Sequence, residues 1–156
     1  MAGRLVPKAP EAIAAGVVVD SRGRVLLQEE LMNNGKMKWV FPGGHIEFGE
    51  RISAAVKREI LEETGLRVRI GKFLGHFEAV FPQFGYHTIV FFHRAKPVSP
   101  GEKLVSEGGK PLRFFPIKAA LKKLELVESS RWLLEGASLK PLSGKDGRNR
   151  ENRKRI

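Results

Sequence analysis

The segment 51–65 constrains this chain most, because it predicts a short helix with three acidic side chains on one face. A helix turns once in about 3.6 residues, so Glu59 and Glu63 lie one above the other and Glu62 lies beside them. Like charges at these spacings destabilise a helix by roughly 0.2–0.5 kcal/mol per pair, which a bound cation would offset. Mg²⁺ prefers oxygen ligands and commonly completes its shell with substrate phosphates. The pattern therefore indicates a metal site suited to phosphate chemistry.

The spacing around this helix is more specific than the acidic cluster itself. It begins at Gly44, reaches Glu50 after five residues, and continues through Arg58-Glu59 and Glu62-Glu63 to Gly65-Leu66. This arrangement resembles the Nudix box, and the preceding Trp-Val-Phe-Pro-Gly-Gly of residues 39–44 also looks like the family. The resemblance extends over residues 11–136. It implies an α/β fold, the Nudix-type α/β/α sandwich with a mixed β-sheet.

Periodicity along the chain predicts strands that alternate with helices. Ile52, Val56 and Ile60 give the acidic helix a buried stripe, and Gly65 is a natural C-cap. Residues 29–38 are expected to form a loop. Strands are expected at 11–19, 24–28, 39–41, 45–47, 67–81, 86–95 and 112–115, and helices at 51–65, 117–123 and 127–136. Strands interleaved with helices favour a mixed sheet between helices.

Length and composition favour one domain. The 156 residues, 42% of them hydrophobic, suffice for a single core. We expect an N-terminal extension at 1–10, a Nudix hydrolase domain at 11–139 and a basic, disordered tail at 140–156. The chain contains no cysteine, which excludes disulfides and thiolate metal sites. Without a signal-peptide run or a membrane span, the sequence predicts a cytoplasmic protein with no membrane partner.

The basic tail contributes +5 of the net charge of +11. A solvated terminus is one interpretation of this charge, and an electrostatic arm for nucleic acid is the other. No aromatic residue interleaves the charges of the tail, which argues against base stacking there. The sequence leaves open whether the chain forms a homodimer that completes a substrate pocket.

The resemblance assigns metal-binding roles around the acidic helix. It implies Mg²⁺, with Mn²⁺ as a substitute, held directly by Glu59 and Glu63. Glu62 is expected to be a third ligand or a partner through water. The backbone carbonyl of Gly43 or Gly44 commonly joins such ligands in the family, and glycine permits the close approach that this requires.

Other residues of the box and of a later loop have supporting roles. Arg58 is expected to orient the glutamates by pairing with Glu62 or with Glu50. Glu50 is interpreted either as an outer metal contact or as an ordinary acid at the helix start. Nudix enzymes differ in whether the glutamate that accepts a proton from water lies in the box or on a distant loop. Here Glu107 is the preferred loop candidate, ahead of Glu102, and a solvated loop glutamate is the alternative.

Substrate contacts are less clearly defined by the sequence. Phe41, His45 and Phe81 are the candidates, with core packing the alternative for Phe41 and a surface hydrogen bond the alternative for His45. The implied reaction is attack of water on a diphosphate bond in a nucleoside diphosphate derivative, with ADP-ribose or a nucleoside triphosphate favoured. The alternatives are an RNA-directed protein that acts on or binds 5′-phosphorylated RNA, and a non-catalytic nucleotide-sensing domain.

Overall fold

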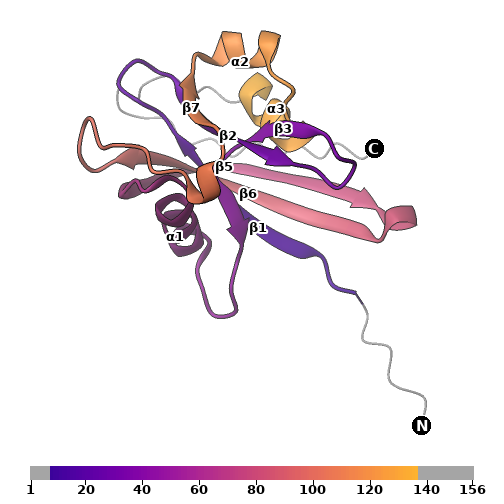
Figure 1. Ribbon diagram of the computed structural model, residues 1–156. Helices are drawn as coiled ribbons and strands as arrows, with labels where there is room; N and C mark the ends of the chain where they lie inside the picture. Colours follow the sequence, from indigo (N-terminus) through magenta and orange to yellow (C-terminus); the bar gives the residue numbers. More distant parts are fainter. Residues whose placement is uncertain (1–7, 137–156) are drawn as a thin grey trace.

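The computed structural model describes residues 8–136, so the expected tail and most of the expected extension lie outside the described residues. The larger of two sheets has the strand order β4-β1-β6-β5 (Figure 1). Strands β1 and β6 run parallel, whereas β4 and β5 pair antiparallel with their neighbours, so this sheet is mixed as predicted. Its strands are β1 (Glu11–Val18), β4 (Gly43–His45), β5 (Val68–Phe81) and β6 (Tyr86–Pro97).

The second sheet is antiparallel, with the order β3-β2-β7. Its strands are β2 (Val25–Leu31), β3 (Met37–Val40) and β7 (Leu112–Phe115). The loop predicted at 29–38 is too long, because Glu29 and Glu30 continue β2 and pair with Trp39 and Lys38. Glutamate is depleted in strands, and cross-strand pairing overrides that preference here. The strand predicted at 45–47 is also displaced, since β4 ends at His45.

Helices cover the sheets from two sides, as Figure 1 shows: α1 lies on one side, and α2 and α3 lie on the other. They are α1 (Ile52–Thr64), α2 (Ile117–Lys123) and α3 (Glu128–Gly136). The predicted end of α1 is confirmed, because Gly65 adopts a left-handed conformation with φ 73° and donates its N–H to the carbonyl of Leu61. With α1 on one side of the sheets and α2 and α3 on the other, the predicted α/β/α arrangement is present. Within residues 8–136, no helix has the length and apolar character needed to cross a bilayer.

Alternation along β1 divides the core into two layers. Ala15 and Val17 pack with residues of α2 and α3, whereas Ala14 and Val18 pack with residues of α1. Gly16 lies on the α1 side, where an added Cβ would stand 2.3 Å from Cδ1 of Ile60. A side chain at this position would hold α1 away from the sheet. The glycine thus allows the helix to lie close to β1 and β4, which brings its acidic face to the glycine-rich strand.

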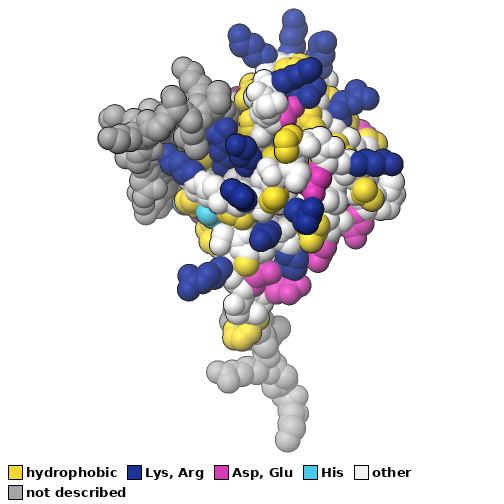
Figure 2. Space-filling model, turned by 90° about the vertical axis from the view of Figure 1, so that its left-hand side faces the viewer, with side chains coloured by type: hydrophobic (Ala, Val, Ile, Leu, Met, Phe, Trp, Pro, Cys, Tyr) yellow, Lys and Arg dark blue, Asp and Glu magenta, His cyan; other side chains and the backbone are white. Residues whose placement is uncertain are grey.

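Two short 3₁₀ turns complete the described chain. The first, η1 (Pro82–Phe84), closes the long β5–β6 hairpin, and the second, η2 (Glu107–Gly109), interrupts the loop before β7. Figure 1 shows the tip of the hairpin projecting away from α1. The surface carries many basic side chains: Figure 2 shows lysines and arginines over much of one face, with acidic side chains gathered toward its lower right. Such a surface attracts anionic ligands over long range.

Candidate functional site

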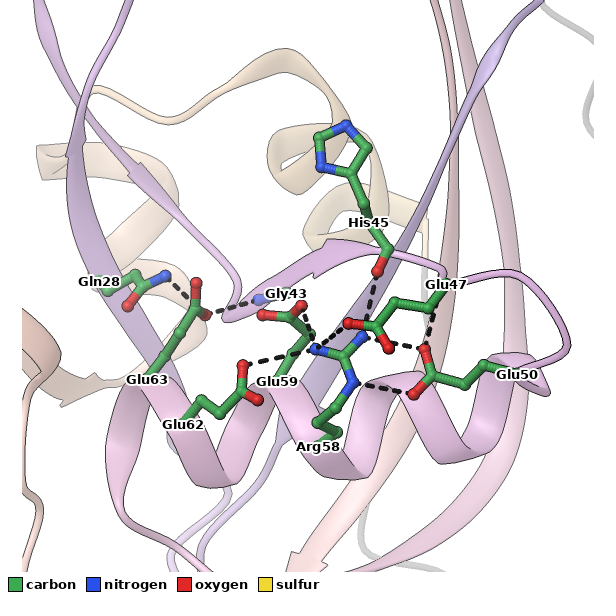
Figure 3. A network of polar contacts seen from close by, with 9 residues as sticks. All are labelled: Gln28, Gly43, His45, Glu47, Glu50, Arg58, Glu59, Glu62 and Glu63. Atoms are coloured by element: carbon green, nitrogen blue, oxygen red, sulfur yellow. Dashed lines mark hydrogen bonds and ion pairs between the residues drawn. The ribbon is translucent and has the colours of Figure 1, made fainter.

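The three predicted glutamates of α1 lie together beside β4, as Figure 3 shows. They differ in exposure: the Glu59 side chain is 13% exposed, the Glu62 side chain is 54% exposed and Glu63 is 8% exposed. The Glu59 carboxylate abuts Gly44, where an added Cβ would stand 2.5 Å from a carboxylate oxygen. A side chain at this position would therefore displace the Glu59 carboxylate from where it lies here.

Glu63 is a buried carboxyl group held by two hydrogen-bond donors. Its Oε2 accepts hydrogen bonds of 2.8 Å from the backbone N–H of Gly43 and from Nε2 of Gln28. Burial raises the pKa of Glu63 to about 7, and the negative charge of Glu59 adds to this effect, while the two hydrogen bonds oppose it. Among residues 8–136, no cationic side chain pairs with Glu63. This end of the cluster therefore lacks a direct ion pair, although the charge of Lys110, which is paired with Glu30, also acts on Glu63.

Arg58 is the centre of the opposite end of the cluster. Its Nε and Nη2 bond both oxygens of Glu50 at 2.8 and 2.9 Å, and its Nη1 bonds Glu59 at 2.8 Å. It also donates to the carbonyl oxygen of His45 at 3.1 Å and lies 3.4 Å from Glu62. Both pairings predicted for Arg58 are thus present. The Arg58 hydrogen bonds lower the pKa of Glu50 to about 2, and these carboxylates in turn raise the pKa of Arg58.

The loop before β7 is anchored at the end of the acidic helix. The N–H of Val105 donates to the carbonyl of Thr64 at 2.9 Å, one residue beyond Glu63 in the sequence. Glu107 follows in η2 and is exposed. The competing loop acid, Glu102, pairs with Arg67 at 3.3 Å. Of the two loop glutamates, only Glu107 has no ion pair among the described residues.

The three predicted substrate residues lie away from the acidic face. Figure 3 shows the His45 side chain pointing away from α1, and its Nε2 lies 3.6 Å from a carboxylate oxygen of Glu11. Phe41 is 4% exposed, and its ring packs edge-on against Phe92, so it belongs to the core and offers no face to a ligand. Phe81 lies at the tip of the β5–β6 hairpin (Figure 1).

The donor set suits a hard divalent cation, although the side chains do not converge on one point here. Within residues 8–136, no three histidine or acidic side chains are arranged so that they could hold a metal ion together. Arg58 holds Glu59, while Gln28 and Gly43 hold Glu63. All the candidate ligands are nevertheless oxygen atoms, and the acids around Arg58 outnumber it. This all-oxygen, negatively charged set fits the ligand preference of Mg²⁺ or Mn²⁺.

Comparison with known proteins agrees with this geometry. Residues 10–135 match the family model of the NUDIX domain, and the chain belongs to the Nudix family. It is 32% identical over 108 residues to the ADP-ribose pyrophosphatase of Methanocaldococcus jannaschii, covering 68% of this chain and 62% of the relative. It is 39% identical over 93 residues to the MutT-like protein of Streptomyces ambofaciens, covering 60% of this chain and 56% of the relative. The match thus spans less than two thirds of either relative.

Solved structures agree with the fold. The NUDIX hydrolase from Nitrosomonas europaea superposes with a TM-score of 0.66 at 27% sequence identity. This superposition covers 81% of the present chain and 87% of the Nitrosomonas chain. The similarity therefore extends over most of both chains, and the predicted fold class is confirmed.

Proposed function

We propose that this protein is a metal-dependent Nudix pyrophosphohydrolase that cleaves a diphosphate bond in a nucleoside diphosphate derivative. The observation that carries the proposal is the acidic face of α1, where a buried Glu63 that makes no direct ion pair within residues 8–136 lies beside Glu59. Membership of the Nudix family and the similarity to an ADP-ribose pyrophosphatase support it. ADP-ribose and nucleoside triphosphates are the proposed substrates.

Glu59, Glu62 and Glu63 would hold the cation, with the backbone carbonyl of Gly44 as an additional oxygen ligand. For Glu59, direct ligation means exchanging a contact that it makes here with Arg58, whereas Glu63 can offer Oε1 while Oε2 keeps the hydrogen bonds from Gln28 and Gly43. When bound, Mg²⁺ or Mn²⁺ polarises phosphoryl oxygens and neutralises charge on the leaving group. The protein contributes by presenting these carboxylates from one rigid helix packed against the sheet.

Arg58 orients the glutamates and does not contact the substrate. Its fork to Glu50 anchors the guanidinium, and its remaining N–H groups fix Glu59. The proton of the attacking water passes to a carboxylate, for which Glu107 and Glu62 are the candidates. The docking of the Glu107 loop at the end of α1 supports Glu107, because it places that loop beside the acidic helix.

The nucleoside is proposed to lie on the sheet face opposite α1. His45 pairs with Ile13 of β1, which alternates with Ala15 and therefore faces α2 and α3. Phe81 lies on the same side, because it alternates along β5 with Phe77, which packs in that layer. Between them lie Glu11 and Thr88, which are paired across β1 and β6. Thr88 is 3% exposed, and its hydroxyl is buried without a hydrogen-bond partner among the described residues, so the more exposed His45 and Glu11 are the side chains proposed to meet a ligand there.

A metal-supplemented hydrolysis screen tests the proposal. The panel comprises ADP-ribose, nucleoside triphosphates, sugar nucleotides, dinucleoside polyphosphates and 5′-triphosphorylated RNA. We expect turnover with Mg²⁺ or Mn²⁺, reversible loss with a chelator, and a fall in kcat of several orders of magnitude in Glu63→Gln. Near-wild-type turnover by Glu63→Gln at saturating metal would refute the proposed site. Turnover of RNA alone would favour the RNA-directed alternative, and no turnover with any substrate would favour the sensing domain.

A further inference from the structure

Gln28, on β2, is a buried polar residue that had no predicted role. It is 2% exposed, and its neighbours Leu26 and Leu27 are fully buried. Burying an amide without partners costs roughly 1–3 kcal/mol, so an apolar residue would be the more stable choice in this position. The contacts that the amide makes therefore have to offset this cost.

Those contacts connect three parts of the chain. Nε2 of Gln28 donates to Oε2 of Glu63 at 2.8 Å and lies 3.4 Å from Oε1 of Glu30. The same Oε1 of Glu30 accepts a hydrogen bond from Nζ of Lys110 at 2.8 Å. The line from Glu63 to Lys110 joins α1, β2 and the segment after η2. It starts at a buried carboxyl group and ends at a partly exposed ion pair.

The two donors to Glu63 reach the same oxygen from fixed positions. Gly43 donates from the backbone of β4, and Gln28 donates from the interior of β2. Together they restrict rotation of the carboxyl group, because both hydrogen bonds would be lost if Oε2 turned away. Within residues 8–136, Oε1 of Glu63 receives no hydrogen bond, so it is the oxygen left for a further ligand.

We infer that Gln28 is a positioning residue for the proposed reaction: its amide orients the Glu63 carboxylate for cation binding, and Glu30 and Lys110 hold the amide. This inference rests on the proposed function, because it takes Glu63 as a ligand of the divalent cation. Removing a residue that orients a ligating side chain typically lowers metal affinity or activity by about 10–100-fold. Glu30 and Lys110 should contribute less to cation binding than Gln28 does, since they are more exposed.

The test is the affinity of the full chain for Mn²⁺, measured by isothermal titration calorimetry without substrate. Gln28→Met keeps a side chain of similar size, removes the amide and should raise the Kd about 10–100-fold. Lys110→Met should change it by less than about fivefold, because loss of the exposed ion pair with Glu30 loosens the amide while loss of the positive charge favours the cation. Two matched controls should leave the Kd unchanged: Ser130→Ala removes a buried polar group in the other layer, and Lys122→Met removes an exposed lysine of α2.

A double-substitution cycle tests whether Gln28 acts through Glu63. In a Glu63→Gln background, Gln28→Met should change the residual Mn²⁺ Kd by less than about twofold, because the group that it positions is already altered. A full 10–100-fold loss in that background would show that Gln28 acts by another route and would overturn the inference.

The remaining outcomes separate the inference from the proposed function. A Gln28→Met protein with wild-type Kd, alongside a wild-type chain that hydrolyses substrate, overturns the inference alone. A wild-type chain without hydrolysis, in which Gln28→Met still weakens Mn²⁺ binding, overturns the proposed function alone. A wild-type chain that binds no Mn²⁺ overturns both. If circular dichroism shows that Gln28→Met is unfolded, Gln28→Asn takes its place: it keeps an amide but shortens the side chain by one methylene, and a wild-type Kd in that variant overturns the inference.

Discussion

Replacing Glu63 with glutamine should stabilise the metal-free protein, and it should do so increasingly as the pH rises. The folded protein raises the pKa of Glu63 from 4.5 to about 7, mainly through burial. Between these two values the folded chain keeps a proton on Glu63 that the unfolded chain releases. The free energy of unfolding of the wild type therefore falls as the pH rises through this window, whereas the glutamine variant does not titrate at this position.

The expected size follows from the two pKa values. The pKa of Glu63 is 4.5 in the unfolded chain and about 7 in the folded chain. Its ionisation therefore lowers the free energy of unfolding by about 1 kcal/mol at pH 5 and about 3 kcal/mol at pH 8. Glutamine can accept both hydrogen bonds that Gln28 and Gly43 donate, so packing and polar contacts are conserved. The variant should thus gain about 2 kcal/mol over the wild type between pH 5 and pH 8.

Urea unfolding of both proteins at pH 5 and pH 8, with a chelator present, measures this gain. Comparing the two proteins at each pH removes the contribution of other titrating groups, such as Glu50, whose low pKa is common to both. Glu62→Gln is the matched control: it removes an exposed carboxylate of the same helix face and should change the free energy of unfolding by less than about 0.5 kcal/mol at both pH values.

Two outcomes would refute this reasoning. The first is a Glu63→Gln protein whose advantage over the wild type is the same at pH 5 and pH 8, because a pH-independent gain cannot come from a titrating carboxyl group. The second is a variant less stable than the wild type at pH 8. Either result would mean that burial does not penalise the ionised Glu63, and the electrostatic basis for placing a cation beside it would be lost.

Two further predictions concern the glycines and the proton acceptor. An added Cβ at Gly44 meets the flexible end of Glu59, whereas at Gly43 it would stand 2.4 Å from a backbone oxygen of β1. Gly44→Ala should therefore lose hydrolysis while its thermal unfolding stays near wild type, and Gly43→Ala should lose about 1–3 kcal/mol of stability. For the proton acceptor, kcat and Mn²⁺ affinity should be compared in Glu107→Gln and Glu62→Gln. The variant that lacks the proton acceptor should have a lower kcat with unchanged Mn²⁺ affinity. Equal, small losses of kcat in both variants would exclude a single carboxylate base.

The acidic helix could be predicted from the sequence because its determinants are local. The buried stripe, the left-handed Gly65 and the glutamate spacing all lie within one short segment, and each is sufficient to mark a boundary or a face. The bounds of Leu112–Phe115 were predicted for similar reasons, since a loop rich in glycine and proline precedes this strand. The extension of β2 through Glu29 was not predictable, because only pairing with β3 makes that polar segment a strand.

The supporting contacts of the site depend on tertiary structure. Gln28 and Glu63 are 35 residues apart, and nothing in either segment predicts that they share a hydrogen bond. One local signal does exist: Gln28 follows Val25, Leu26 and Leu27, and a polar residue that continues a fully buried run needs an internal partner. The sequence thus indicates that such a partner exists, while the packing of α1 against the sheet determines that the partner is a candidate metal ligand.

The acidic cluster divides into two halves with opposite electrostatic character, and this division explains where a cation would gain most. Arg58 already neutralises the half around Glu50, whose pKa is about 2. Glu63, with a pKa of about 7, is penalised by burial and makes no direct ion pair among the described residues. A divalent cation at the Glu63 end would offset an existing cost, whereas at the Glu50 end it would compete with a guanidinium. Because ligation requires the ionised carboxylate, cation binding and proton release from Glu63 are coupled near neutral pH.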